Sequence, residues 1–297
     1  MQLIISSLAL RALFTLLMLQ APFLVAKEKI IALPLVDGGH LRQPYDIALL
    51  LGALSATEKE YGPYQFELPG HTMVSDRTLL ELGTGKNLSV AVSTYKKTWE
   101  GKTLVVPFPI RRGLGSYRFF FANSKNRHKF AQVHTLEQLK SFTFGQGLSW
   151  STTKILNDHG LRVVTENSYG GLFKMLQAGR FDLFMRGADE IVREQRTIAS
   201  THNKLYIEDR VVVFTYLPMY YNVTPTRPKL AERIEAGLIA MHESGSFDRL
   251  FLQYHADEIA LARGSKSNII TLKNTNLPKH LYERDKPYLM DFSESVP

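Results

Sequence analysis

Cysteine is absent from the 297-residue sequence, which excludes disulfide bonds and thiolate metal sites. The nine histidines show neither a His-Glu-x-x-His pattern nor another clustered spacing, so we expect no metal site. The sequence also lacks a Gly-x-Ser-x-Gly nucleophile motif and a phosphate-binding P-loop. We therefore expect neither catalytic residues nor a bound cofactor.

Long runs of charge of one sign are missing as well. The sequence has 36 lysines and arginines against 28 acids, a formal net charge of +8, and the basic residues are scattered among the acids. A nucleic-acid-binding surface needs basic residues gathered on one face, so we expect no nucleic-acid partner. We interpret the excess as favouring solubility and attraction to anionic envelope surfaces or to an anionic ligand.

One long apolar run is present, at the N-terminus. Residues 1–26 carry a single charge, Arg11, followed by the apolar run Ala12–Leu19, the helix breaker Pro22 and the small residue Ala26. This order is typical of a secretory signal peptide. An uncleaved membrane anchor is the alternative, because the stretch is about 20 apolar residues long. We expect cleavage after Ala26, export to the periplasm and no lipid anchor, since the sequence has no cysteine to carry one.

The rest of the sequence alternates between strand and helix patterns. We expect strands at residues 30–35, 88–92, 103–108, 119–122, 142–144, 162–164, 182–185 and 211–216, and helices at 45–61, 75–82, 151–158, 169–176, 189–196, 230–241 and 247–254. The last 35 residues show no regular pattern. Repeated strand–helix–strand units indicate an α/β protein with largely parallel sheets. Because no Pro/Ser-rich linker occurs, two lobes would have to be interleaved.

Four segments, in order along the chain, resemble the periplasmic solute-binding proteins of the polar amino-acid class, family 3 with the type 2 fold. They are Pro109–Arg118, Phe144–Thr153, Gly179–Asp182, and the stretch from Pro228–Ala231 through Gly245–Phe251. The resemblance covers residues 29–254. Within that class the sequence is most similar to a proteobacterial branch whose members end in a tail resembling Leu272–Pro278.

The resemblance implies two interleaved lobes with mainly parallel sheets, joined by a hinge of two crossings. Lobe 1 would comprise residues 27–115 and 219–297, and lobe 2 residues 116–218. The crossings would lie near residues 113–117 and 216–221. Gly113 and Gly115 suit a hinge, because glycine accepts the dihedral changes that closure of the lobes requires.

The resemblance also implies a function. A monomer would bind a small polar solute, amino-acid-like or otherwise carboxylate-bearing, between the lobes and deliver it to an inner-membrane permease of the ABC type. A ligand sensor that docks on a membrane signalling receptor is the alternative. An enzyme is less favoured, because the known enzymes of this kind carry an additional domain of about 150 residues.

The best local signal for a binding site is the segment Gly147–Thr153, in which a glycine-rich strand end leads into a helix. Such a segment presents backbone N–H groups and hydroxyls to an anion. Resembling proteins hold an amino-acid carboxylate with the equivalent Ser/Thr loop. The candidates here are Ser149, Trp150, Ser151 and Thr152. The alternative is ordinary helix capping by Ser151 or Thr152.

Arg186 follows an expected strand directly, at the strand's carboxyl end. Resembling proteins often carry an acid near this position, which pairs with the ligand amine. An arginine there favours an anionic group on the ligand instead. The alternative is a surface arginine paired with Asp189 or Glu190.

The first crossing contributes Arg111, Arg112 and Tyr117 as further candidates. Side chains alternate along an extended segment, so one of the two adjacent arginines should point into the cleft. The alternative is that both are exposed to solvent.

In lobe 1, Ser93 and Tyr95 begin the segment that occupies the place of a Ser/Thr-then-Arg carboxylate clamp in the resembling proteins. Lysines, Lys96 and Lys97, stand where the clamp would need its arginine. The candidate features supply positive potential or hydrogen-bond donors, and no acid is clearly placed beside them. We therefore expect a ligand with a carboxylate or another anionic group.

The signal-peptide interpretation predicts the N-terminus of the exported protein. Mass spectrometry of protein recovered from the periplasm should give a mature chain that starts at or near Lys27. Recovery of intact Met1 in the membrane fraction would show instead that the apolar run is an anchor.

Overall fold

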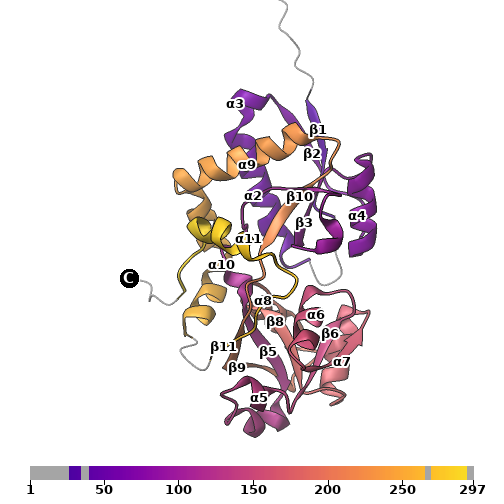
Figure 1. Ribbon diagram of the computed structural model, residues 1–297, viewed down its shortest axis with the longest axis vertical. Helices are drawn as coiled ribbons and strands as arrows, with labels where there is room; N and C mark the ends of the chain where they lie inside the picture. The colour runs from indigo at the N-terminus through magenta and orange to yellow at the C-terminus, as the bar shows by residue number, and fades with distance from the viewer. Residues whose placement is uncertain (1–26, 35–39, 265–268, 293–297) are drawn as a thin grey trace, which may run out of the picture.

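The computed structural model describes residues 27–34, 40–264 and 269–292, which form two lobes (Figure 1). The predicted signal peptide lies outside these residues. None of the helices within them is both long enough and apolar enough to span a bilayer.

Lobe 1 combines strands from the N-terminal part of the chain with a strand and a helix that arrive much later (Figure 1). It contains strands β1 (Glu28–Ile31), β2 (Tyr64–Glu67), β3 (Val90–Thr94), β4 (Leu104–Val105) and β10 (Met219–Val223), helices α2 (Gln43–Ala56), α3 (Glu58–Tyr61), α4 (Ser75–Thr84) and α9 (Pro228–Glu243), and the 3-10 helix η1 (Lys97–Trp99). Strands β1 and β2 pair in parallel, and the antiparallel order β3–β10–β4 forms the other sheet.

Lobe 2 is built on a six-stranded sheet in the order β11–β9–β5–β8–β6–β7. Its elements are β5 (Tyr117–Asn123), β6 (Thr143–Gly147), β7 (Arg162–Glu166), β8 (Leu183–Gly187), β9 (Leu205–Phe214), β11 (Ile269–Thr271), α5 (Leu136–Leu139), α6 (Ser151–Asp158), α7 (Tyr169–Gln177), α8 (Ala188–Ile198) and the 3-10 helix η3 (Ser124–Phe130). Strand β6 is parallel to β7 and β8, whereas β5 is antiparallel to β8 and β9. Because β5 leads the chain into this lobe and β9 leads it out, these two neighbours run in opposite directions.

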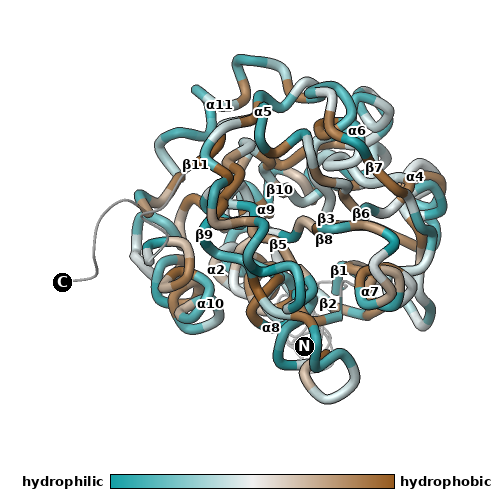
Figure 2. Tube along the Cα trace, turned by 90° about the horizontal axis from the view of Figure 1, so that it is seen from below, coloured by the Kyte–Doolittle hydropathy of each residue, from teal (hydrophilic) through white to brown (hydrophobic). Residues whose placement is uncertain are grey.

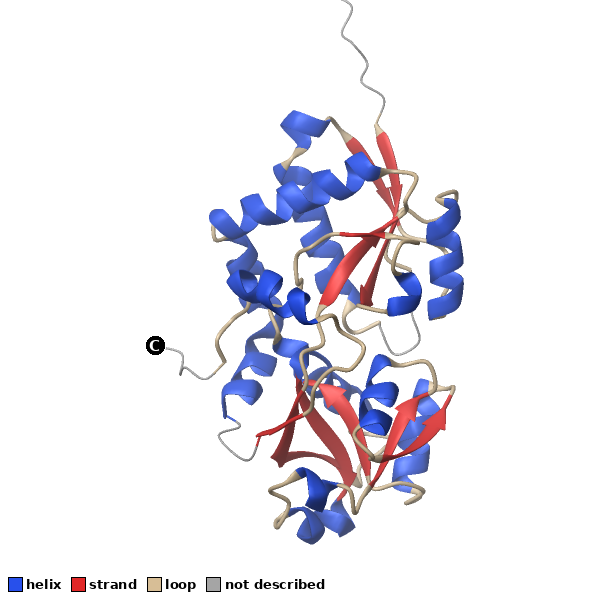
Figure 3. Cartoon of the chain, in the orientation of Figure 1, coloured by secondary structure: helices blue, strands red, loops and turns tan. Residues whose placement is uncertain are grey.

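Four further elements complete the part of the chain that the structure describes. They are η2 (Leu114–Ser116), α10 (Ser246–Gly264), α11 (Lys279–Asp285) and η4 (Lys286–Tyr288). Figures 1 and 3 show α10 and α11 at the level where the two lobes meet. The predicted α/β class with two interleaved lobes is confirmed, but the sheets are mixed rather than mainly parallel, and the chain enters lobe 2 once more at β11.

Several elements follow directly from local sequence. Ser168 caps α7, as predicted, by accepting a hydrogen bond from the Gly171 N–H at 3.3 Å. In α9, Gly237 lets the helix approach α2 closely, because a Cβ at this position would lie 2.1 Å from the carbonyl oxygen of Ala53. Figure 2 shows α10 with hydrophobic and hydrophilic stretches alternating along its turns, as expected for a helix with one buried side.

The described C-terminal residues, 269–292, are not irregular, and the expectation of no regular structure there was wrong. Strand β11 pairs with β9, so residues 269–271 lie in the lobe 2 sheet, whereas the whole segment 219–297 was assigned to lobe 1. The chain then returns to the hinge, where Asp285 accepts hydrogen bonds from the hydroxyls of Tyr216 and Tyr220. The C-terminal segment therefore contacts both lobes.

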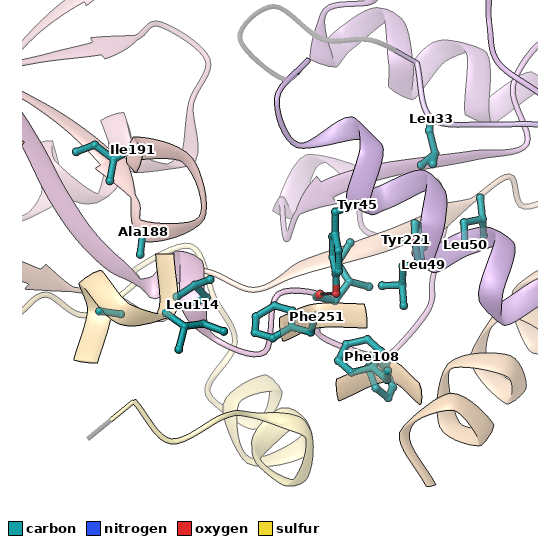
Figure 4. Packing of buried hydrophobic residues seen from close by; sticks show 14 of the residues in the cluster. Leu33, Tyr45, Leu49, Leu50, Phe108, Leu114, Ala188, Ile191, Tyr221 and Phe251 are labelled. Carbon is teal, nitrogen blue, oxygen red and sulfur yellow. Dashed lines mark hydrogen bonds between the residues drawn. The ribbon is translucent and has the colours of Figure 1, made fainter. Parts of the chain in front are cut away.

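One hydrophobic cluster runs through the junction between the lobes (Figure 4). In lobe 1 it contains Tyr45 and Leu49 of α2, and it continues through Leu114 at the hinge to Ala188 and Ile191 of α8. The lobes therefore share apolar core at their base.

A buried ion-pair cluster lies beside this apolar contact. Arg111, which is 2% exposed, places Nη2 2.6 Å from Asp46 Oδ1 and Nε 3.3 Å from Asp189 Oδ2. Asp46 belongs to α2 of lobe 1 and Asp189 to α8 of lobe 2. The guanidinium also lies 4.6 Å from the centre of the Tyr45 ring, a cation–π contact. Arg111 thus joins the two lobes electrostatically.

Removing this charge should destabilise the protein strongly. In Arg111→Met the carboxylates of Asp46 and Asp189 would remain buried without their cation, so the free energy of unfolding should fall by about 3–5 kcal/mol. Arg196→Met is the matched control, because Arg196 and Asp257 form an exposed pair and the stability should hardly change. Denaturant unfolding of both variants checks this, and equal stabilities would contradict it.

Candidate functional site

A cavity of about 270 Å³ lies between the lobes. The polar residues that lobe 1 contributes to its lining are Arg42, Gln43, Asp46, Ser75, Thr78, Ser93, Thr94 and Lys96. Lobe 2 contributes Arg118, Ser149, Ser151, Thr152, Glu166, Asn167, Tyr169, Arg186, Asp189 and Glu190. Apolar walls come chiefly from Met73, Val74, Trp99, Trp150, Leu217 and Met219. The cavity is therefore polar and charged on both sides, and each lobe contributes a tryptophan to its lining.

The segment between β6 and α6 lines the cavity with all four of its candidate residues, Ser149, Trp150, Ser151 and Thr152. Helix α6 begins at Ser151 and has Trp150 at its N-cap position, with no side-chain cap. Capping by Ser151 or Thr152 is therefore not what the structure shows. The first N–H groups of α6 remain available to an acceptor in the cavity.

The hydroxyls of this segment differ in what they already bind. Thr152 donates to Gln146 Oε1 at 2.6 Å, so its hydroxyl hydrogen serves the fold. The Ser151 hydroxyl lies 3.0 Å from Thr94 Oγ1, a hydrogen bond that connects the two lobes. The Ser149 hydroxyl has no hydrogen bond to any residue that the structure describes. A contact between these residues and a ligand stays a prediction.

Arg186 lines the cavity but is not the surface residue considered above, since it is only 3% exposed. Its Nε donates to both Glu194 oxygens, at 2.9 and 3.1 Å, and its Nη2 donates to Glu190 Oε1 at 2.9 Å. Burial alone would lower the pKa of Arg186, but the two glutamates outweigh it and raise that pKa. Among described residues Nη1 has no hydrogen-bond partner, so one nitrogen is left for a ligand.

The structure corrects the expectation that no acid stands beside the candidate residues. The lining described here holds four cations and four carboxylates. The cations are Arg42, Lys96, Arg118 and Arg186, and the carboxylates are Asp46, Glu166, Asp189 and Glu190. The cavity therefore has no excess of positive charge, and positive potential alone does not specify an anionic ligand.

Glu190 contacts all three arginines that line the cavity. It forms ion pairs with Arg42, Arg186 and, at 3.6 Å, Arg118, and it also accepts a hydrogen bond from the Gly187 N–H at 2.8 Å. Burial would raise the pKa of Glu190, but these three arginines hold it well below the usual range of a glutamate. Because Arg42 comes from lobe 1, Glu190 also connects the lobes.

Two lining charges remain without an ion pair to any described residue, Lys96 in lobe 1 and Glu166 in lobe 2. Lys96 Nζ donates to Ser75 Oγ at 2.5 Å, and burial lowers the pKa of Lys96. Glu166 Oε1 accepts from the N–H groups of Asn167 and Ser168, at 2.9 and 3.0 Å. Lys96 and Glu166 can therefore form ion pairs with charged groups of a ligand without breaking an ion pair within the protein.

The arginines of the first crossing do not line the cavity, and the prediction that one of them faces it was wrong. The segment is a turn rather than extended chain: Arg112 has φ +50° and Gly113 φ +85°, so side chains do not alternate there. Neither arginine is exposed either. Arg111 is held by its carboxylates, and Arg112 forms an ion pair with Asp248 and donates to the Tyr288 carbonyl at 3.2 Å.

The two candidate tyrosines also lie away from this cavity, whereas Ser93 lines it. Tyr117 packs edge-on against Phe214 and Phe292, with ring centres 5.2 and 5.3 Å apart. Tyr95 donates to Glu100 at 3.2 Å and lines a smaller cavity of about 180 Å³ beside α11. Ser93 donates its hydroxyl to the Thr94 carbonyl at 2.9 Å.

Seven charged lining residues were not among the candidates: Arg42, Asp46, Lys96, Arg118, Glu166, Asp189 and Glu190. Glu166 carried a usable signal, because it lies between the strand expected at residues 162–164 and Ser168, the expected cap of the next helix. Arg42 and Arg118 had no such signal in the sequence, because only the three-dimensional structure shows that they lie beside Glu190. Among described residues, no group of three or more His, Asp or Glu side chains could hold a metal ion.

Comparison with protein-family models gives no match, and comparison with curated proteins gives no significant one. Solved structures do match. An ancestral arginine-binding protein bound to glutamine is 17% identical, with a TM-score of 0.57, and 77% of this chain covers 98% of it. A binding component of an ABC transporter from Wolinella succinogenes, complexed with lysine, is 13% identical, with a TM-score of 0.57 and coverage of 79% and 97%.

A third similar structure is an ancestral amino-acid-binding protein described as a precursor of cyclohexadienyl dehydratase. It is 16% identical, with a TM-score of 0.56, and the match covers 76% of this chain and 95% of the other. At such identities the likeness shows the fold alone. The chain has the type 2 periplasmic-binding-protein fold, as the sequence resemblance predicted.

The position of Trp150 depends on the absence of a side chain at Gly147. A Cβ there would lie 2.4 Å from the indole ring, so Gly147→Ala should displace Trp150 and lower the free energy of unfolding by about 1–3 kcal/mol. Tryptophan fluorescence in a Trp99→Phe background reports the displacement.

Gly170→Ala is the control for this substitution. Nothing lies within 4 Å of a Cβ at Gly170, and the residue is in α7, where alanine favours the helix. Its stability should be unchanged or slightly raised. An unshifted Trp150 spectrum in Gly147→Ala would contradict the proposed dependence.

Proposed function

We propose that this protein binds a small zwitterionic solute, amino-acid-like, between its lobes in the periplasm and delivers it to an ABC-type importer. The observation that carries the proposal is the pair Lys96 and Glu166. They are opposite charges on opposite lobes of one cavity, and neither forms an ion pair with a described residue. A ligand with an anionic and a cationic group would give each of these two residues an ion-pair partner.

Lys96 is the proposed partner of the ligand carboxylate. Its ammonium group already loses hydration through burial, which lowers its pKa. A carboxylate beside it would restore a favourable environment for the charge and form a charge-assisted hydrogen bond. Ser75, Ser93 and Thr94 line the cavity near it and supply further polar contacts.

Glu166 is the proposed partner of the ligand cation. One of its oxygens accepts two backbone N–H groups, which fixes the carboxylate at the end of β7. The other oxygen has no hydrogen bond to a described residue and can accept from a ligand ammonium. Arg186 Nη1 and the first N–H groups of α6 are additional donors on the same lobe.

The size of the cavity agrees with this ligand class. About 270 Å³ is below the usual range for drug-sized ligands, roughly 300–1,000 Å³, and favours a single small metabolite. The similar structures contain glutamine or lysine, which are zwitterions of this size. They support an amino-acid-like ligand here without identifying it.

Thermal-shift screening with three sets of compounds tests the ligand class. Zwitterionic amino acids should stabilise the mature protein, whereas organic acids and polyamines, which carry charge of one sign, should have little effect. A ligand at about 100-fold excess over Kd adds roughly 2.7 kcal/mol to the free energy of unfolding. Because one similar protein is described as the precursor of an enzyme, each binder is also checked for turnover.

Calorimetric titration of the best binder then tests the two residues. Lys96→Met and Glu166→Gln should each weaken binding about 10- to 150-fold, since a charge-assisted bond contributes roughly 1.5–3 kcal/mol. Lys97→Met is the control, because Lys97 is exposed and does not line the cavity. A Kd within about threefold of wild type in both folded variants would overturn the proposed roles.

A further inference from the structure

We infer that Arg186 fills a cation-binding pocket of lobe 2 with the chain's own guanidinium. The inference deepens the proposed function: if solutes bind in the main cavity, Arg186 excludes a cationic ligand side chain from this part of it. The pocket, here called the cation cage, consists of Trp150, Tyr169, Phe184, Glu190 and Glu194.

The cation cage has the chemistry by which proteins bind free organic cations. The Arg186 guanidinium carbon lies 4.8 Å from the ring centre of Trp150, 5.3 Å from that of Phe184 and 5.5 Å from that of Tyr169. All three distances are within the range of a cation–π contact. Aromatic faces of this kind hold guanidinium and substituted ammonium groups in ligand sites.

Two buried carboxylates complete the cage. Glu190 and Glu194, one turn apart on α8, are 5% and 1% exposed. They accept from Nη2 and Nε of Arg186 at 2.5–3.1 Å. Arg186 therefore donates from Nε and Nη2 to carboxylates while its guanidinium lies near aromatic rings. A guanidinium ligand bound in a recognition site makes the same kinds of contact.

The walls of the cage are held by contacts other than Arg186. Trp150 fits over Gly147 and stacks on Phe184, with the ring planes 20° apart. Glu190 keeps its ion pairs with Arg42 and Arg118 and its hydrogen bond from the Gly187 N–H. The cage should therefore persist when the Arg186 side chain is removed.

The cage also opens toward the main cavity. Trp150, Tyr169, Arg186 and Glu190 all line that cavity, so a shortened side chain at position 186 would join the two spaces. With Arg186 in place, a ligand whose side chain carries a guanidinium or ammonium group finds the cage occupied. Arg186 is thus a specificity-determining residue that favours short or uncharged ligand side chains.

Chemical rescue of Arg186→Ala tests the cage without knowledge of the natural ligand. The variant should unfold at a lower temperature than wild type, because two glutamates lose a cation. Ethylguanidinium at tenfold excess over its Kd should raise the unfolding midpoint of the variant by about 3 °C and leave wild type unchanged. Ethylurea, which is neutral and of similar shape, should have no effect.

One control variant and one alternative variant complete this test. Arg196→Ala removes an exposed arginine and should not respond to ethylguanidinium. Should Arg186→Ala fail to fold, the double variant Arg186→Ala/Glu194→Gln carries one uncompensated carboxylate fewer and is titrated with ethylguanidinium by calorimetry. Absence of rescue or binding in every folded variant would overturn the cage.

The exclusion role has its own measurement. Arg186→Ala should bind L-arginine at least tenfold more tightly than wild type does. Equal or weaker binding by the folded variant would overturn the role in specificity. Because the rescue uses only ethylguanidinium, a failure of the Lys96 and Glu166 predictions leaves its outcome unaffected, and the two proposals can be judged separately.

Discussion

The contact on which the rest of the structure depends is the buried guanidinium of Arg111 between one carboxylate from each lobe. Moving such charges out of water is costly, and they are tolerated only when paired. Asp46 and Asp189 must therefore both approach Arg111, which fixes how the lobes meet at their base. Both carboxylates also line the cavity, so the same ion pairs fix part of its wall.

The charges of the cavity follow from the same constraint. Most of the ionisable side chains that line it are already matched by partners in the protein, and Glu190 alone serves three arginines. Matched charges hold the walls rigid but offer a ligand little. Recognition is thereby left to few groups, Lys96 and Glu166 above all, and this gives single substitutions there a large expected effect.

The sequence predicted well what depends on local pattern. Helix α6 has the predicted bounds, α7 has its predicted cap, and the order of strands and helices sufficed for the α/β class, whereas the two-lobed fold was predicted from the family resemblance. Short elements such as β11 and α11 were missed, because they are stabilised by pairing with distant parts of the chain rather than by a periodic pattern of their own.

Site prediction failed where it assumed a backbone conformation or ignored distant partners. The alternation argument placed Arg111 or Arg112 in the cleft, but a left-handed residue at 112 turns the chain there. The pairing of Arg186 was considered only with Asp189 or Glu190. Glu194, one turn beyond Glu190 on the same helix face, could have been added from its spacing. The pair Arg42–Glu190 spans 148 residues and has no local signature.

The short strand β11 has a consequence for how the protein behaves among its own copies. Strand β9 would otherwise end the lobe 2 sheet, with the apolar residues Val211, Val212 and Val213 along its edge. A long apolar edge offers unpaired N–H and C=O groups to a strand of another molecule and promotes aggregation. By pairing with Val212–Phe214, β11 replaces part of this edge with one only three residues long. The C-terminal segment therefore shortens the apolar edge that lobe 2 presents to other molecules.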